Sequence, residues 1–175
     1  MKKVIVGISG ASSVRLGLKF IRSLPKEYKT FVIATDNAKI VSQKEERFKL
    51  LDDADISECT ASGSFGADMM AIIPCSMNSL AKIAVGIADN LLTRSAAVMI
   101  KEQKKLLLSP REMPYCAISL QNMLTLAQNR VIIAPPIAGF YADIKTLEQM
   151  EDFLIGRWFD LLGIPNDLYK RWSGE

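Results

Sequence analysis

Short apolar runs that alternate with helical patterns constrain the fold of this chain more than any other feature of its sequence. Five such runs recur along the 175 residues: Val4–Ile8, Phe31–Ala34, Met70–Pro74, Leu106–Ser109 and Val131–Ala134. A run that is apolar at nearly every position predicts a strand that is buried on both faces, as in a parallel sheet. We therefore predict a three-layer α/β/α fold, with a mainly parallel sheet between two layers of helices and right-handed crossovers.

Apolar residues at three- and four-residue spacing predict helices between these strands. Three stripes stand out: Val14, Leu18, Ile21 and Leu24; Leu80, Ile83, Ala84 and Ile87; and Leu147, Met150, Leu154, Trp158 and Leu161. Residues 52–66 are first acidic and then rich in Ser and Gly, which predicts an irregular excursion. Because the length suits one domain and no repeat interrupts the pattern, we predict a single domain over residues 1–175.

The absence of histidine excludes several classes of enzyme. Ser-His-Asp and Cys-His catalysis and His-ligated metals all need that side chain, so acid–base chemistry falls to Asp, Glu, Lys, Tyr or Cys. The three cysteines show no CxxC spacing, so we expect no metal site and no disulfides, in keeping with a reducing cytoplasm. The net charge of +3 is too small to predict a nucleic-acid partner, and no stretch is long enough for a signal peptide or a membrane span.

The stretch KVIVGISGASSVRLGLKF, residues 3–20, predicts a strand, a tight turn and a helix. Its glycines do not fit the dinucleotide fingerprint G-x-G-x-x-G, because Gly7 and Gly10 are three residues apart and Gly17 lies inside the helix. What remains is a strand that leads to a helix N-terminus, which is a general site for anions.

Ligands of open α/β sheets bind outside the carboxyl ends of the strands. The predicted strands are followed by the segments 9–13 (SGASS), 35–37 (TDN), 74–79 (PCSMNS), 109–114 (SPREMP) and 135–141 (PPIAGFY). Most of these ends carry small or hydroxyl residues, and one carries an Arg-Glu pair. A rim of hydroxyl and N–H groups with isolated cations suits a phosphorylated, planar cofactor.

Several of these side chains also have an ordinary structural explanation. Ser12 and Ser76 are typical helix caps. The Arg-Glu pair at 111–112 could form a surface ion pair of small energy. Tyr141 and Trp172 could be packing residues. The gathering of these residues at one edge of the sheet is what favours a functional site.

Seven ordered blocks of sequence run through nearly the whole chain. They are VGISGAS (6–12), SGSF (62–65), IIPCSMNSLAKIA (72–84), DNLLTRSA (89–96), LLLSPREMP (106–114), PPIAGFY (135–141) and LGIPNDLYKRW (162–172). In this order and spacing they resemble the UbiX-like flavin prenyltransferases, formerly described as aromatic acid decarboxylase subunits. The resemblance implies a Rossmann-like flavoprotein fold. It also implies an enzyme that joins a dimethylallyl group from dimethylallyl phosphate to N5 and C6 of reduced FMN, without a metal.

The resemblance carries further expectations about partners. The product, prenylated FMN, would serve a UbiD-type decarboxylase. Members of the family assemble as homo-oligomers, commonly dodecamers. Two other functions stay open: an FMN-binding carrier or partner subunit of a decarboxylase, and a flavin-dependent cysteine decarboxylase. The latter class uses a catalytic histidine, which this chain lacks.

The resemblance also implies roles for individual residues. The FMN site would comprise Gly10, Ala11, Ser12, Thr35, Ser76, Met77, Asn78, Ser79 and Arg94. The prenyl-phosphate site would comprise Lys101, Arg111, Tyr141 and Arg157. The catalytic residues would be Glu112 as the proton-shuttling glutamate, Ser12, Glu45 as a second glutamate, and Trp172 beside the allyl group. Cationic groups and a tyrosine hydroxyl stabilise a leaving phosphate, and aromatic faces stabilise an allyl cation.

Some positions depart from the pattern of this family. GASS replaces the usual GASG, Leu16 stands where a tyrosine is common, and Thr35 begins a TDN run in place of Ser-Lys-Ala. SLQNM at 119–123 stands where HLENM is usual. Because only glycine adopts a positive φ cheaply, we predict that Ser13 has ordinary helical dihedral angles. We also predict that Ser12 or Ser13 caps the following helix.

Overall fold

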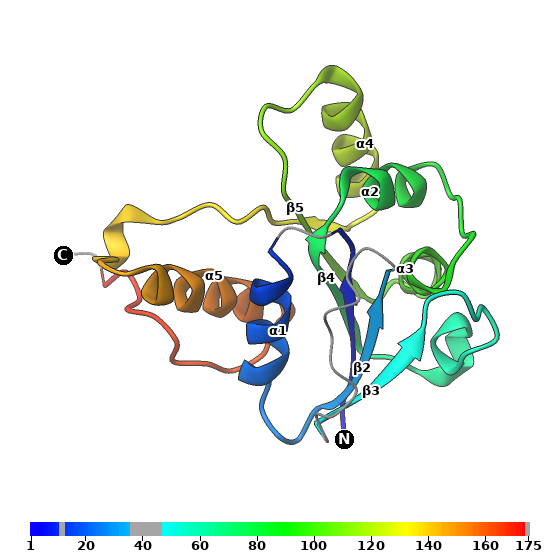
Figure 1. The fold of residues 1–175 in the computed structure, drawn as a ribbon, viewed down its shortest axis with the longest axis horizontal. Coiled ribbons are helices and arrows are strands. Elements are labelled where there is room, and N and C mark those ends of the chain that lie inside the picture. The colour runs from blue at the N-terminus through cyan, green and yellow to red at the C-terminus, as the bar shows by residue number, and fades with distance from the viewer. Residues whose placement is uncertain (11–12, 36–46, 174–175) are drawn as a thin grey trace.

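A parallel sheet lies at the centre of the computed structural model, which describes residues 1–10, 13–35 and 47–173 (Figure 1). Its strands are β1 (Lys3–Ile8), β2 (Lys29–Ala34), β3 (Phe48–Asp52), β4 (Met69–Cys75), β5 (Lys105–Pro110) and β6 (Ile132–Ile133). Their order in the sheet is β3-β2-β1-β4-β5-β6, and every neighbouring pair is parallel. The sheet grows in opposite directions from β1 and β4, so the carboxyl ends of these two strands form the switch point of the fold.

Four of the five predicted runs lie within strands, and the fifth, Val131–Ala134, contains the two-residue strand β6, which confirms the prediction of a parallel sheet. The central strand β4 is buried at every one of its seven positions, as expected for a strand that helices cover on both faces. The strand β3 was not predicted. Its sequence FKLLD is buried only at Leu51, because β3 lies at the edge of the sheet and does not need a continuous apolar run.

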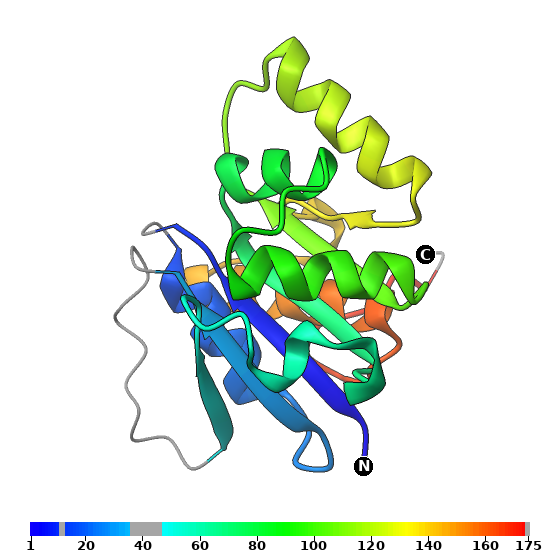
Figure 2. The same ribbon diagram turned by 90° about the vertical axis from the view of Figure 1, so that its right-hand side faces the viewer.

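Helices cover both faces of the sheet, which confirms the three-layer α/β/α fold. Figure 1 shows α1 (Val14–Ser23) and α5 (Leu147–Leu162) on one face, and α2 (Met77–Ala84) and α3 (Leu91–Lys101) on the other. The helix α4 (Ala117–Gln128) stands apart from the sheet, beside α2 (Figure 2). Two short 3-10 helices, Cys59–Ala61 and Gly63–Phe65, occupy the region that was predicted as irregular.

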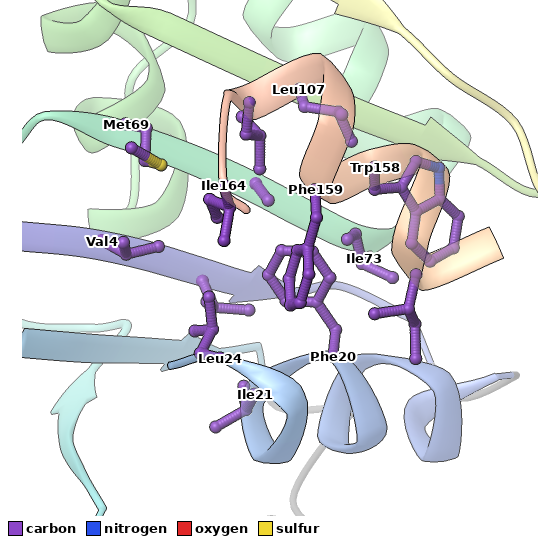
Figure 3. Packing of buried hydrophobic residues seen from close by; sticks show 14 of the residues in the cluster. Val4, Phe20, Ile21, Leu24, Met69, Ile73, Leu107, Trp158, Phe159 and Ile164 are labelled. Carbon is purple, nitrogen blue, oxygen red and sulfur yellow. The ribbon is translucent and has the colours of Figure 1, made fainter. Parts of the chain in front are cut away.

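Aromatic side chains fill the core between α1, α5 and the sheet (Figure 3). The ring of Phe20 meets the ring of Phe159 edge to face, with 4.9 Å between the centroids. Trp158 is also buried, and its indole N–H donates to the carbonyl oxygen of Ala134 at 3.0 Å. This bond ties α5 to the segment that follows β6, because a buried indole N–H needs an acceptor.

The helical stripes are confirmed in part. Val14, Ile21 and Leu24 are buried against the core as predicted. Ile87 was predicted wrongly to continue the second stripe, because α2 ends at Ala84 and the side chain of Ile87 is 47% exposed. In α5, Leu147 and Leu161 are exposed. That helix is covered both by the sheet and by the C-terminal segment, so its buried residues do not follow a single stripe.

Gly17 shows why a glycine stands inside α1. A Cβ atom at this position would overlap the carbonyl oxygen of Ile73 in β4. The helix therefore crosses β4 at a distance that only glycine allows, and Gly17 has a packing role. Within the described residues no helix is long and apolar enough to cross a membrane.

Candidate functional site

The switch point between β1 and β4 is closed by a short series of hydrogen bonds. The N–H of Ser9 donates to the carbonyl oxygen of Pro74 at 3.0 Å, and the N–H of Ser76 donates to Oγ of Ser9 at 2.9 Å. Ser9 is only 1% exposed. Its hydroxyl therefore holds the ends of the two central strands together. Ser9 was not predicted as a site residue, because nothing in the neighbouring sequence distinguishes this hydroxyl from one in a loop.

The predicted cap at Ser76 is confirmed. Its Oγ accepts a hydrogen bond from the N–H of Ser79 at 3.2 Å, at the start of α2. The following N–H groups of Met77 and Asn78 have no acceptor within the helix, as at any helix N-terminus. The start of α2 therefore presents N–H groups and hydroxyls at the switch point, a combination that suits a phosphate or a polar ring.

Gly10 faces this helix start from the other side of the switch point. Its φ of +95° is a conformation that favours glycine, and a Cβ at this position would lie 3.5 Å from Cβ of Ser76. The backbone at Gly10 is thus open toward α2. Thr35 follows β2 and is half-buried, and its N–H donates to the carbonyl oxygen of Ile8 at 3.0 Å.

The prediction for Ser13 is wrong. Ser13 precedes α1 with φ 71° and ψ 19°, in the left-handed region, and its side chain makes no capping hydrogen bond. A serine in this region carries a strain that a glycine would avoid. The other predicted cap, Ser12, lies outside the described residues, as do Ala11 and Glu45.

Arg94 lies in the first turn of α3, and the start of this helix is firmly anchored. Asn90 and Thr93 form a reciprocal capping box. The carboxylate of Asp53 accepts hydrogen bonds from the side chain of Asn90 at 2.8 Å and from the N–H of Leu92 at 2.9 Å. Arg94 itself is exposed, with its Nε donating to the carbonyl oxygen of Ala61 at 3.2 Å. These contacts fix Arg94 at the end of α3 that lies near the carboxyl ends of the strands.

Lys101 lies at the opposite end of α3. The helix runs from the carboxyl ends of the strands toward their amino ends, where β5 begins at Lys105 (Figure 2). There Nζ of Lys101 pairs with Oε1 of Glu102 at 2.7 Å. A single chain therefore does not bring Lys101 together with Arg111, although the sequence assigned both to one site.

Arg111 and Glu112 directly follow β5, and both are exposed. Oε1 of Glu112 accepts a hydrogen bond from the N–H of Met113 at 3.1 Å. The surface ion pair considered for Arg111 and Glu112 does not form in the described part of the chain. Both side chains stay open to solvent at the carboxyl end of β5, next to β4 in the sheet.

Tyr141, Arg157 and Trp172 come from three separate segments, and the structure brings them into one cluster. The ring centroids of Tyr141 and Trp172 are 6.1 Å apart. Phe153 lies between Tyr141 and Tyr169, with centroid distances of 5.7 and 5.1 Å. The hydroxyl of Tyr169 accepts a hydrogen bond from Arg157 at 3.3 Å. This hydrogen bond, with smaller charge effects from Tyr169, Tyr141 and Asp160, raises the pKa of the Arg157 guanidinium against the opposing effect of burial.

The side chains described above could bind anions and exchange protons. They offer guanidinium groups, a carboxylate and aromatic faces, in addition to the N–H groups of α2. Among the residues that the structure describes, no group of three or more Cys, Asp or Glu side chains is placed to hold a metal ion. The guanidinium, carboxylate and aromatic groups themselves are suited to anion binding, proton exchange and stabilisation of a cation.

Comparison with known proteins gives close matches over the whole chain. Residues 1–158 match the family described as Flavoprotein. Flavin prenyltransferase UbiX of Helicobacter pylori strain J99 is 49% identical over 184 aligned positions, which cover 98% of each chain.

Two solved structures resemble this fold closely. One, described as a dodecameric FMN-dependent UbiX-like decarboxylase from Escherichia coli O157:H7, has a TM-score of 0.91 and 34% identity, and the match covers 98% of this chain and 100% of the other. The other is AnUbiX (PadA1) in complex with FMN and dimethylallyl pyrophosphate. It has a TM-score of 0.92 and 31% identity, with 99% of this chain and 98% of the other covered.

Proposed function

This chain belongs to the Flavoprotein family and within it to the UbiX-like flavin prenyltransferases, and on that basis we propose which reaction it performs. The enzyme joins a dimethylallyl group from dimethylallyl phosphate to N5 and C6 of reduced FMN. The observation that carries this proposal is the cluster of Tyr141, Arg157 and Trp172, which gathers an anion-binding group and an aromatic face from distant parts of the chain.

FMN fits the residues of the switch point. Gly10 leaves the backbone open toward α2, where a side chain would fill the space. Ser76, Ser79 and the first N–H groups of α2 would hold polar atoms of the flavin, with Arg94 as a cation for its phosphate. Reduced FMN would supply the nucleophilic atoms of the reaction.

The prenyl phosphate would be held by Arg157, Arg111 and the hydroxyl of Tyr141. These groups stabilise the phosphate as the allylic C–O bond breaks, because cationic donors bind an oxyanion strongly. The indole face of Trp172 stabilises the allyl cation. Glu112, which is open to solvent and free of an ion pair with Arg111, would protonate the departing phosphate or remove a proton from the flavin. No metal is assigned a part in these steps.

Lys101 supports an oligomer in which one copy completes the site of another. It lies at the amino ends of the strands, whereas Arg111 follows the carboxyl end of β5, so the two do not meet within one chain. Large apolar side chains on and beside α4 also point to contact between copies: Met113 is 91% exposed and Ile118 75%. We propose a homo-oligomer of the kind described for the Escherichia coli protein, a dodecamer.

We further propose that the 175 residues act as one flavoprotein domain, and that the prenylated FMN passes to a UbiD-type decarboxylase. All three cysteines are free thiols, which supports action in a reducing cytoplasm.

Mass spectrometry of the flavin tests the reaction. Purified protein is incubated without oxygen with reduced FMN and dimethylallyl phosphate, and the released flavin is expected to gain one dimethylallyl unit. Samples that lack either the donor or the protein serve as controls. Unchanged FMN, bound stoichiometrically, would instead indicate an FMN carrier. Release of CO2 from a phosphopantothenoylcysteine substrate would indicate a cysteine decarboxylase.

A further inference from the structure

The carboxylate of Asp160, near the end of α5, is surrounded by four donor side chains. They are Tyr169 Oη at 2.6 Å, Arg171 Nη2 and Nη1 at 2.8 and 3.0 Å, Asn166 Nδ2 at 2.9 Å and Arg157 Nη1 at 3.3 Å. We call these five residues the Asp160 cluster. Three of the donors belong to the segment after α5, so the cluster holds this segment, and with it Trp172, against the helix.

The two arginines do not share the carboxylate equally. Arg171 meets it as a fork, with one nitrogen on each carboxylate oxygen, which is the strong geometry for such a pair. Arg157 touches Asp160 through a single nitrogen at 3.3 Å, and the same nitrogen is 3.3 Å from the hydroxyl of Tyr169. Within the described part of the chain, the Nε and Nη2 atoms of Arg157 have no acceptor.

The charge of the cluster follows from this geometry. Burial alone would raise the pKa of the Asp160 carboxyl, but hydrogen bonds from Arg171, Tyr169 and Asn166 outweigh burial and hold that pKa at about 2. Asp160 is therefore ionised at neutral pH and carries one negative charge between two guanidinium groups. Arg171 neutralises most of it, so the positive charge of Arg157 remains available.

We propose that Arg171 is a positioning residue of the prenyl-phosphate site, because it occupies Asp160 and thereby leaves Arg157 free to bind the phosphate. This inference rests on the proposed function. Without Arg171, the guanidinium of Arg157 is the remaining cation beside an ionised carboxylate. It would then pair fully with Asp160, and the substrate phosphate would have to compete with that carboxylate for it.

Steady-state kinetics of three variants test this role. Arg171→Gln should raise KM for dimethylallyl phosphate about three- to tenfold, the effect of one partly screened ion pair, with a smaller change in kcat and no change in FMN affinity. Adding Asp160→Asn to Arg171→Gln should return KM to near the wild-type value, because no carboxylate remains to capture Arg157. The KM of Arg171→Lys should lie between those of wild type and Arg171→Gln, since lysine keeps the positive charge but cannot contact both carboxylate oxygens as a fork.

A purely structural role of Arg171 gives the opposite result. The double variant would then be worse than Arg171→Gln, because it has lost a further hydrogen bond. A cycle with Arg157→Gln gives an answer even if Asp160→Asn does not fold: once Arg157 is absent, Arg171→Gln should not change KM further. The inference is overturned, and the proposed function is not, if the double variant keeps the raised KM or if Arg171→Gln still changes KM when Arg157 is absent. Absence of prenyl transfer by the wild-type enzyme overturns the proposed function and this inference with it.

Discussion

The switch point and the exposed residues that are predicted to react are built in different ways. At the switch point, backbone groups and the buried hydroxyl of Ser9 hold β1 and β4 together. By contrast, the exposed rim, by which we mean Arg111, Glu112, Tyr141, Arg157 and Trp172, consists of long side chains that solvent reaches. The difference teaches that changes at the switch point should act on folding as well as on FMN binding, whereas changes to the exposed Arg111 and Glu112 should act on the reaction and leave stability intact.

The largest expected effect is on catalysis in the rim. Glu112→Gln should slow prenyl transfer about 10²- to 10⁴-fold, because an amide keeps the size of the side chain but cannot exchange a proton. The thermal midpoint and the FMN affinity should not change, since Glu112 is exposed and, among the described residues, accepts a hydrogen bond only from the N–H of its neighbour Met113. Single-turnover rates measure the first effect, with Glu27→Gln, another exposed glutamate, as the control. A rate within threefold of wild type would remove Glu112 from the mechanism.

The largest expected loss of stability lies behind the switch point. Gly17→Ala should lower the free energy of unfolding by about 3 kcal/mol, because the added methyl group would overlap the backbone oxygen of Ile73, which cannot move aside cheaply. Urea unfolding measures this loss, and Ser23→Ala at the end of the same helix is the control. If Gly17→Ala unfolds like wild type, α1 is able to shift and the switch point is less rigid than its hydrogen bonds indicate.

The Asp160 cluster, which includes Arg157 of the rim, should make the free energy of unfolding depend on pH. The pKa of Asp160 is about 2 in the folded protein, below its ordinary value of 3.8. Its stabilising contribution is therefore complete above about pH 4 and is lost as pH falls toward 2. The shift corresponds to about 2 kcal/mol of unfolding free energy. Comparing wild type with Asp160→Asn between pH 5 and pH 2 should show the difference in stability shrinking with acid; a constant difference would contradict the lowered pKa.

The smallest expected effect reverses what the sequence led us to expect at Ser13. Because Ser13 has a φ of 71° and caps nothing, Ser13→Gly should stabilise the protein by up to about 1 kcal/mol, the strain relieved less the added freedom of the unfolded chain. Ser13→Ala keeps the Cβ atom and is the matched control, with little expected change. Thermal unfolding of the two variants separates strain from loss of the hydroxyl. A loss of stability in Ser13→Gly would show that the left-handed conformation is not strained.

Much of the fold could be predicted, and the reasons differ from element to element. The buried strands β1, β2, β4 and β5 were found because a strand covered on both faces must be apolar at nearly every position. The edge strand Phe48–Asp52 was missed because solvent reaches much of it. Ser76 was correctly predicted as a cap from its place before an apolar helix. Ser9 was not singled out, because nothing local distinguishes a buried hydroxyl that joins two strands from one that lies in a loop.

The sequence by itself determined the layered architecture and the family, and it predicted a site at the carboxyl ends of the strands. These depend on apolar periodicity and on ordered motifs, which are properties of neighbouring residues. Only the tertiary structure decided that Ser13 is left-handed, that Lys101 lies at the amino ends of the strands and away from Arg111, and that Arg171 occupies Asp160 beside Arg157. These features depend on where the chain is forced to turn and on which charges meet after folding, and both arise from contacts between residues far apart in the sequence.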